Sequence, residues 1–209
     1  MIGVMDLLRN ISRGQKPYGF VDAGRRKKAK VAIDKGLNVI LEMQVVVNGK
    51  KTVWCAQHNK DDLSPAKARA YELPSLSGNE SVGIVEYLMK VENPGEDVKK
   101  AIHCAAAWFE ASKLTGLKVE WMKAEDKPGG RDRIVVQDPE AGPLWARFYE
   151  LGTNKPMFVG RDGVIKDNLE DIEHERRVGY SYLGNYAEEL LESEYPEWAK
   201  KIMAMNLNR

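Results

Sequence analysis

Two long segments without sustained helical periodicity most constrain how this chain folds. Residues 54–78 and 117–168 lie between stretches of helical spacing, and both are longer than the ~15 residues of an ordinary connection. The second holds only a short possible strand, Ile134 to Val136, and its "EDKPGGRDR" stretch is polar enough to predict a mobile excursion. Much of the remainder is rich in Trp, Tyr, Arg and His, a composition that indicates ordered loops able to carry a site.

Helical spacing predicts the scaffold around these segments. Apolar stripes and end signals predict helices over residues 22–43, 80–91, 96–115, 169–177 and 185–205, the last bent or broken at Pro196. Asn48-Gly49, between β-branched residues, predicts a hairpin within Val45 to Trp54. The first apolar residues share one helical face with nothing before Met1 to cap it, so we expect the chain to begin inside a helix.

Composition bounds the number of domains and the kinds of partner. A chain of 209 residues that is 43% hydrophobic can bury one ordinary core, so we expect a single domain over residues 1–209. The balance of 32 basic and 31 acidic residues provides no broad basic surface for nucleic acid or an anionic membrane. Any anion site must be local. The start, "MIGVMDLLRN", lacks the features of a signal peptide, so the chain as written is expected to stay in the cytoplasm.

Several common chemistries are not supported by the sequence. His58, His103 and His174 form no ligand spacing with one another or with the two cysteines, so no metal site is predicted from these residues. No nucleotide-binding glycine motif or nucleophile elbow is present. Cys55 and Cys104 could form a disulfide or remain as buried thiols, and the second reading is favoured. Cys55 beside His58 could form a nucleophile and base, although a packed cysteine is the more common case.

Arginines on the long loops are the strongest indication of a site. Arg69, Arg147 and Arg161 lie beside aromatic residues, and Arg176 lies near the end of a predicted helix. A guanidinium group binds a carboxylate through two parallel hydrogen bonds, so several converging arginines suit a sugar acid or an oligomer of one. For any one of them a structural role is the favoured alternative, for example Arg161 pairing with Asp162 or Glu150, or Arg69 pairing with a nearby carboxylate such as Glu72.

Four blocks of the sequence resemble the family 10 polysaccharide lyases, the pectate (pectic acid) lyases. They are "WCAQHN", "ARAYELPSLSGNESVGIV", "AAAWFEASKLTG" and "PLWARFYELGTNKPMFVGRDGVIKDNLEDIEHERRVGYSYLG", in the family's order. The resemblance implies a mainly α fold, an incomplete α/α toroid (α/α barrel) with long functional loops and a short β-hairpin. The chain would be the C-terminal part of the catalytic module, without its N-terminal helices. Asn59 stands where the family pattern has an aspartate, and "GYSYLG" is less aromatic than the family's block.

The resemblance also implies a chemistry. Pectate lyases cleave polygalacturonate by β-elimination, in which a proton leaves C5 of a galacturonate, the C4 oxygen is expelled, and unsaturated oligogalacturonides form. Arg69 would be the proton acceptor, although arginine is a poor base without desolvation and a neighbouring cation. Arg147 and Arg161, with Asp162 and Arg176 as further candidates, would hold substrate carboxylates. Calcium would neutralise a substrate carboxylate, with its ligands expected mostly in the missing N-terminal segment.

The same resemblance sets the remaining expectations. The partners would be oligogalacturonates, the protein a monomer, and the full-length form secreted or periplasmic. We expect Arg147 and Arg161 to lie within reach of one another. A truncated, catalytically silent chain that only binds oligogalacturonate is the main alternative, and the chain alone is expected to be weak or inactive. A hydrolase using a pair among Glu72, Asp162 and Glu175 is the third possibility.

Overall fold

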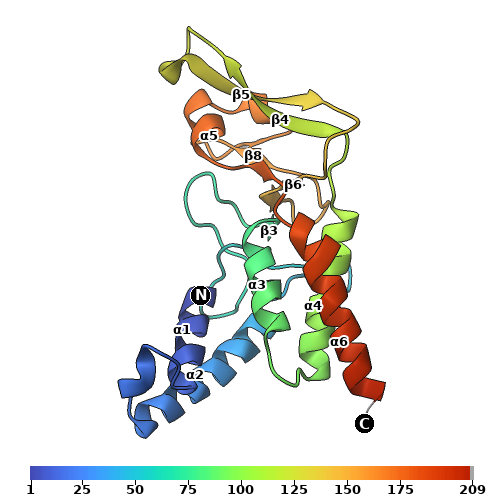
Figure 1. Ribbon diagram of the computed structural model, residues 1–209. Helices are drawn as coiled ribbons and strands as arrows, with labels where there is room; N and C mark the ends of the chain where they lie inside the picture. Colours follow the sequence, from blue (N-terminus) through green and yellow to red (C-terminus); the bar gives the residue numbers. More distant parts are fainter. Residues whose placement is uncertain (208–209) are drawn as a thin grey trace.

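The computed structural model describes residues 1–207, and the side chains of residues 1–205. Most helices gather toward one end of the molecule, and the longest strand pair lies at the other (Figure 1). The α-helices are α1 (Ile2–Ser12), α2 (Ala23–Glu42), α3 (Glu80–Met89), α4 (Glu96–Ala111), α5 (His174–Gly179) and α6 (Tyr195–Leu207). Single helical turns lie at Tyr18–Phe20, Pro128–Gly130 and Leu169–Asp171, and a π-helical turn at Leu190–Glu194 runs directly into α6.

The strands form separate antiparallel pairs instead of one sheet. The pairs are β1 (Val46–Val47) with β2 (Lys50–Lys51), β3 (Leu76–Ser77) with β7 (Phe148–Tyr149), β4 (Leu117–Lys123) with β5 (Arg131–Gln137), β6 (Trp145–Ala146) with β10 (Leu183–Gly184), and β8 (Phe158–Val159) with β9 (Ile165–Lys166). Two of these pairs join segments far apart in the chain. They fix the long irregular segments relative to each other.

The predicted fold class is wrong. Helices make up 44% of the structure and strands 17%, and the helices form no clear toroid. The largest error falls on the segment expected to be a long loop with one short strand. It contains the seven-residue hairpin strands β4 and β5, whose tip carries the stretch expected to be a mobile excursion. Apolar and polar residues alternate from Leu117 to Trp121, which is the spacing of a half-buried strand.

Several element predictions are confirmed. Helices α2, α3 and α4 begin within one residue of their predicted starts. The Asn48-Gly49 hairpin forms, with φ values of 49° and 76° that a tight two-residue turn requires. The helix predicted over residues 169–177 is wrong in extent, because a single turn precedes the short α5. Pro196 does not break the last helix: a five-residue π-helical turn, Leu190–Glu194, runs directly into α6 just before this proline, which lacks the backbone N–H that a regular α-helix would use.

Aromatic side chains tie the irregular segments to the helices. The indole N–H of Trp54 donates to the carbonyl of Ile40 in α2 at 2.7 Å, and that of Trp145 donates to Phe109 in α4 at 2.8 Å. The Tyr149 hydroxyl donates to the Ser112 carbonyl at 2.9 Å. All three rings are at most 1% exposed, and the polar atom of each ring makes a hydrogen bond. Each buried ring therefore holds its irregular segment in place. The expectation that these aromatic loops are ordered is confirmed.

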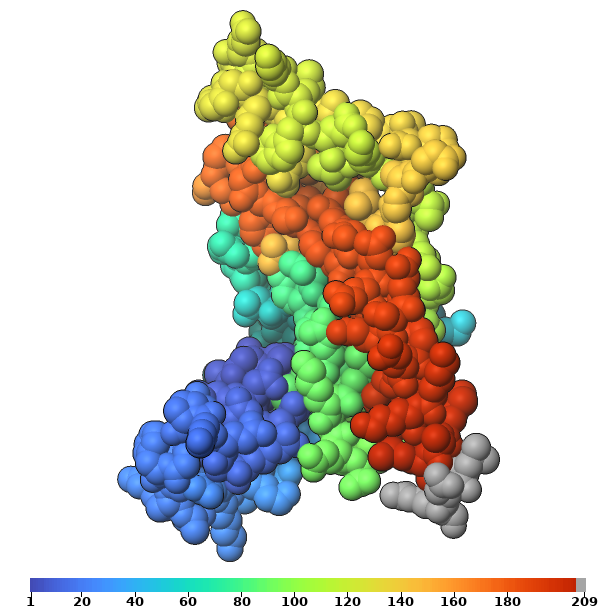
Figure 2. Space-filling view, viewed as in Figure 1, coloured from blue at the N-terminus to red at the C-terminus, as the bar shows by residue number. Residues whose placement is uncertain are grey.

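The molecule is elongated in this view, with α1 and α2 forming a lobe at one end and the β4–β5 hairpin overhanging α5 at the other (Figure 2). Over residues 1–207, none of the helices has the length and apolar character needed to span a bilayer.

Cys55 and Cys104 are both free thiols, and Cys55 is buried, which confirms the favoured interpretation for Cys55.

Candidate functional site

Arg147 lies where two of the short strand pairs meet. It is the single residue between β6 and β7, which pair with β10 and β3 respectively. Its backbone N–H donates to the carbonyl of Tyr182 at 2.7 Å, and its carbonyl accepts from Gly78 at 2.9 Å. The backbone is therefore held on both sides, and this fixes the direction in which the arginine side chain leaves the chain.

Two tyrosines form the floor of the site. The rings of Tyr71 and Tyr180 meet edge to face, with centroids 5.3 Å apart. The Arg147 guanidinium carbon lies 4.5 Å from the centroid of the Tyr180 ring, and that of Arg176 lies 4.7 Å from the Tyr71 ring. Arg69 contacts both rings, at 5.2 Å and 5.7 Å. Three sequence-predicted arginines thus converge on one pair of rings, and cation–π attraction helps to hold them there.

Each arginine of this cluster is paired with a glutamate. Arg69 makes a two-pronged contact with Glu72, at 2.8 Å and 2.5 Å, and Arg147 pairs with Glu80 at the start of α3. Arg176 and Arg161 share Glu175, and Arg161 donates to it at 3.0 Å and 2.9 Å. We call Arg69, Arg147, Arg161 and Arg176 the arginine cluster. Within it, an anionic ligand would have to compete with a carboxylate of the protein.

The pairs shift the pKa values of their members apart. The Arg69 hydrogen bond lowers the pKa of Glu72 to about 2, and the Tyr180 hydroxyl, which donates to Glu72 at 2.7 Å, acts in the same direction. Hydrogen bonds from Arg161 and Arg176 lower the pKa of Glu175 to about 2. The contact with Glu72 raises the pKa of Arg69 above its ordinary value. At neutral pH these groups are therefore charged, and Arg69 is held in its protonated form.

Within the arginine cluster, Arg161 is linked to Arg176 through Glu175. Arg147 contacts Tyr180, Tyr180 contacts Tyr71, Tyr71 contacts Arg176, and Glu175 bridges Arg176 to Arg161. A direct approach of Arg147 to Arg161 thus stays a prediction, although both belong to one connected set. Arg161 pairs with Glu175 instead of the Asp162 or Glu150 considered from the sequence.

Asp162 has a local structural contact. Its carboxylate accepts the backbone N–H of Val164 at 3.0 Å and lies 3.5 Å from the Lys166 ammonium. This turn, in which Gly163 adopts a φ of 72°, connects the strands β8 and β9. The substrate-binding role proposed for Asp162 is not tested by these contacts.

Sequence reasoning missed the two tyrosines and Glu80. Glu72 stands three residues after Arg69, a spacing that brings side chains together in a tight turn, and the sequence did suggest this pair as a structural alternative. Tyr71 and Tyr180 gave no such signal, because they are 109 residues apart. Only the pairing of distant strands brings them together.

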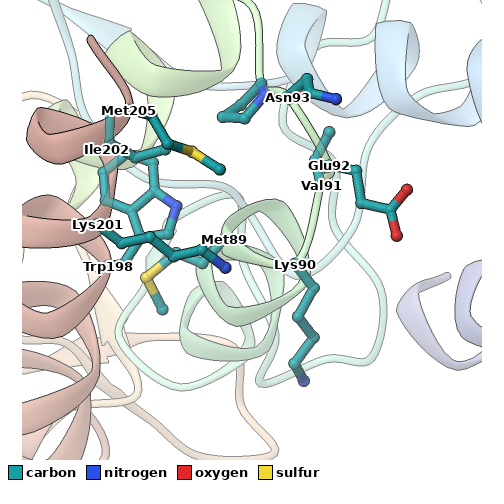
Figure 3. Close-up of a pocket in the computed structure, with 10 residues that line it drawn as sticks. Met89, Lys90, Val91, Glu92, Asn93, Trp198, Lys201, Ile202 and Met205 are labelled. Carbon is teal, nitrogen blue, oxygen red and sulfur yellow. The ribbon is translucent and has the colours of Figure 1, made fainter. Parts of the chain in front are cut away.

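Two further features of the described residues bear on ligands. No group of three or more His, Cys, Asp or Glu side chains that could hold a metal ion occurs among residues 1–205. A cavity of about 300 Å³ lies between the end of α3 and α6, lined by Met89, Trp198 and Ile202 among others (Figure 3). It contains no member of the arginine cluster.

Guanidinium groups held over aromatic rings are suited to binding an acidic, ring-shaped ligand such as a chain of sugar acids. The model of the pectic acid lyase family matches residues 1–191 of this chain, and the chain belongs to that family. This finding confirms the resemblance seen in the sequence blocks.

Two solved structures resemble the chain. The family 10 polysaccharide lyase from Cellvibrio cellulosa is 34% identical with a TM-score of 0.78, and the match covers 90% of this chain and 57% of that one. An aspartate-to-alanine variant of a family 10 polysaccharide lyase from the same organism, solved with trigalacturonic acid, is 34% identical with a TM-score of 0.79, over 91% of this chain and 58% of that one. The chain thus spans less than two thirds of the length of these structures. A comparison with curated proteins found no significant match.

Proposed function

We propose that this chain binds oligogalacturonate at the arginine cluster and acts in the cleavage of polygalacturonate by β-elimination, as a pectate lyase. The observation that supports this most is the convergence of Arg69, Arg147 and Arg176 on Tyr71 and Tyr180, in a chain of the pectic acid lyase family. A relative in the same family binds trigalacturonic acid. Guanidinium groups provide the two-pronged partners that the carboxylates of such a ligand need.

In this proposal Arg147, Arg161 and Arg176 hold substrate carboxylates, and Arg69 accepts the proton from C5. The contact with Glu72 opposes that role, because it stabilises the protonated guanidinium. Arg69 therefore has to leave Glu72 before it can take a proton. We further propose that calcium takes part in the reaction, but we assign no step and no ligand to it, since residues 1–205 gather no metal-binding group.

The carboxylates disfavour hydrolysis. An inverting or retaining hydrolase needs a carboxylic acid that is still protonated near neutral pH. Glu72 and Glu175 have the opposite property, because hydrogen bonds from arginines lower the pKa of each to about 2. Asp162 is engaged by Val164 and Lys166, and its pKa is also lowered, chiefly by the Val164 N–H.

A second candidate function is binding of oligogalacturonate without turnover. It is favoured by one observation, the lack of a metal-binding group of side chains within residues 1–205. The two candidates share the ligand and differ in the product. They are therefore separated by measuring binding and bond cleavage independently.

The test uses the purified chain with trigalacturonate and with polygalacturonate plus calcium. We expect calorimetric binding of trigalacturonate and a slow, chelator-sensitive rise in ultraviolet absorbance from the unsaturated product. Arg69→Ala should reduce elimination at least about 100-fold and change binding little, since the lost interaction belongs to the transition state. Lys67→Ala, an exposed cation two residues away, is the control.

Each outcome separates the possibilities. Binding without any product supports the silent chain, and new reducing ends without ultraviolet absorbance would indicate a hydrolase. Absence of binding would overturn the proposal altogether. Near-normal turnover of a folded Arg69→Ala variant would remove Arg69 from the mechanism.

A further inference from the structure

The β4–β5 hairpin carries a second group of cations next to the arginine cluster. The register places Trp121 opposite Arg133 and Lys123 opposite Arg131, so these four residues share one face of the hairpin. Nearer the root of the hairpin, Val119 and Val135 on the same face pack against the core. Toward the tip the face is left open, and Trp121 is 46% exposed.

The indole ring gathers the two arginines. The guanidinium carbon of Arg131 lies 4.3 Å from the centroid of the Trp121 ring, and that of Arg133 lies 4.6 Å from it. Two guanidinium groups repel each other, and the negative face of the indole offsets part of that repulsion. We call Trp121, Arg131 and Arg133 the hairpin platform.

The platform differs from the arginine cluster in one respect that matters for an anion. Among residues 1–205, neither Arg131 nor Arg133 is paired with a carboxylate. The Nε of Arg133 is buried and has no hydrogen-bond partner in that part of the chain. Burial lowers the pKa of Arg133, and the charge of Arg131 adds to this effect, as expected for a cation that lacks its counter-charge.

The platform adjoins the cluster. Arg133 donates to the backbone carbonyl of Tyr180 at 3.2 Å, and the Tyr180 ring contacts Arg147 and Arg69. The hairpin is held in this position by Arg177, which donates to Asp132 at 2.7 Å, and by His174, whose ring contacts the Arg131 carbonyl at 2.8 Å. A sugar-acid chain lying on the cluster would therefore meet the platform next.

We propose that the hairpin platform is an additional subsite, in which Arg131 and Arg133 bind the carboxylate of a galacturonate unit beyond those held by the arginine cluster. Trp121 is a positioning residue that keeps the two guanidinium groups together. This inference rests on the proposed function. It adds a prediction of its own, that affinity depends on the length of the oligomer.

The test compares binding of trigalacturonate and hexagalacturonate by calorimetry. The double variant R131Q/R133Q should bind the hexamer about tenfold more weakly than the unmodified chain and the trimer within about twofold. The matched control is K118Q/K127Q, which removes two cations of the same hairpin that are already paired, with Glu120 and Asp126. It should bind both oligomers within about twofold.

A second variant guards against misfolding. The Arg131 side chain is exposed and donates no hydrogen bond to any side chain or backbone group of residues 1–205, so R131Q alone should stay folded and still weaken hexamer binding about threefold. A neutral galactose hexamer should bind the unmodified chain and R131Q/R133Q equally, because it offers no carboxylate.

The failures are distinguishable. If the unmodified chain binds neither oligomer, the proposed function fails and this inference fails with it. If it binds both, but R131Q/R133Q loses no more hexamer affinity than the control, or loses trimer and hexamer affinity equally, only the subsite is overturned.

Discussion

At the scale of single residues, Glu72 is a buried carboxylate that joins Arg69 to Tyr180. It is 9% exposed, accepts two side-chain hydrogen bonds from Arg69 and accepts another from Tyr180. A buried carboxylate with several donors is stabilised in its charged form, which explains its pKa of about 2. The same contacts hold Arg69 in place and tie the loop of residues 54–78 to Tyr180.

We expect Glu72→Gln to lower the free energy of unfolding by about 2 kcal/mol at pH 7, the order of a hydrogen-bonded charge pair. The folded pKa of Glu72 is lower than its ordinary value of 4.5, so its contribution is complete above that value and is lost as the pH falls toward 2. The difference between the two proteins should therefore shrink between pH 4.5 and 2. Urea unfolding at pH 7, 4 and 3 measures it.

Glu175→Gln is the control for this prediction. Glu175 has a similarly lowered pKa but its side chain is 54% exposed, so solvent screens its interactions and the effect on stability should be much smaller. A Glu72→Gln difference that is the same at pH 3 as at pH 7 would contradict the proposed linkage.

At the scale of elements, the β3–β7 pair is the joint between the two irregular segments. A Cβ atom on Gly78 would lie 2.1 Å from the carbonyl oxygen of Ala146, and the Gly78 N–H donates to the Arg147 carbonyl at 2.9 Å. Because the obstructing atom belongs to the backbone, it cannot turn away as a side chain can. Any side chain at this position has to push the strands apart.

We expect Gly78→Ala to destabilise the protein by about 2–3 kcal/mol and to lower its Tm by roughly 5–10 °C. Gly83→Ala is the control, because a Cβ there would meet nothing within 4 Å and the residue lies within α3, where alanine is favoured. Its Tm should be unchanged or slightly higher. Equal melting temperatures for the two variants in a thermal scan would show that the close approach at Gly78 has no energetic weight.

The helices and strands differ in how well they could be predicted from the sequence. Helices α2, α3 and α4 were predictable because their apolar spacing and end signals are local. The β4–β5 hairpin was missed although apolar and polar residues alternate from Leu117 to Trp121 and a short strand was expected at Ile134 to Val136, because the Gly and Pro residues at the tip were interpreted as an excursion instead of a turn. Four arginines of the site were found from their residue type, and three of them converge. Their glutamate partners and the tyrosine floor depend on contacts across the fold, which local patterns do not contain.

At the scale of the whole molecule, basic and acidic residues are nearly equal in number, but the arginine cluster and the hairpin platform differ in how their charges are paired. The formal net charge is +1, and each arginine of the cluster has a glutamate partner. The helices of the described residues form no clear toroid of the kind expected from the family resemblance, and the matches cover 57–58% of the length of the solved relatives. The site therefore has to be understood from its local contacts.

Those contacts give the two parts of the site different sensitivities to ionic strength. At the cluster, a ligand carboxylate replaces a carboxylate of the protein, so few mobile counterions leave when it binds. Within residues 1–205, Arg131 and Arg133 have no carboxylate partner, so they attract counterions from solution, which a ligand must displace. Raising NaCl from about 50 to about 500 mM should thus weaken hexagalacturonate binding more steeply in the unmodified chain than in R131Q/R133Q, and trigalacturonate binding least. Parallel salt dependences in calorimetric titrations would contradict this. If the difference is found, the hairpin causes the preference for long over short pectic fragments to depend on the salt concentration of the surroundings.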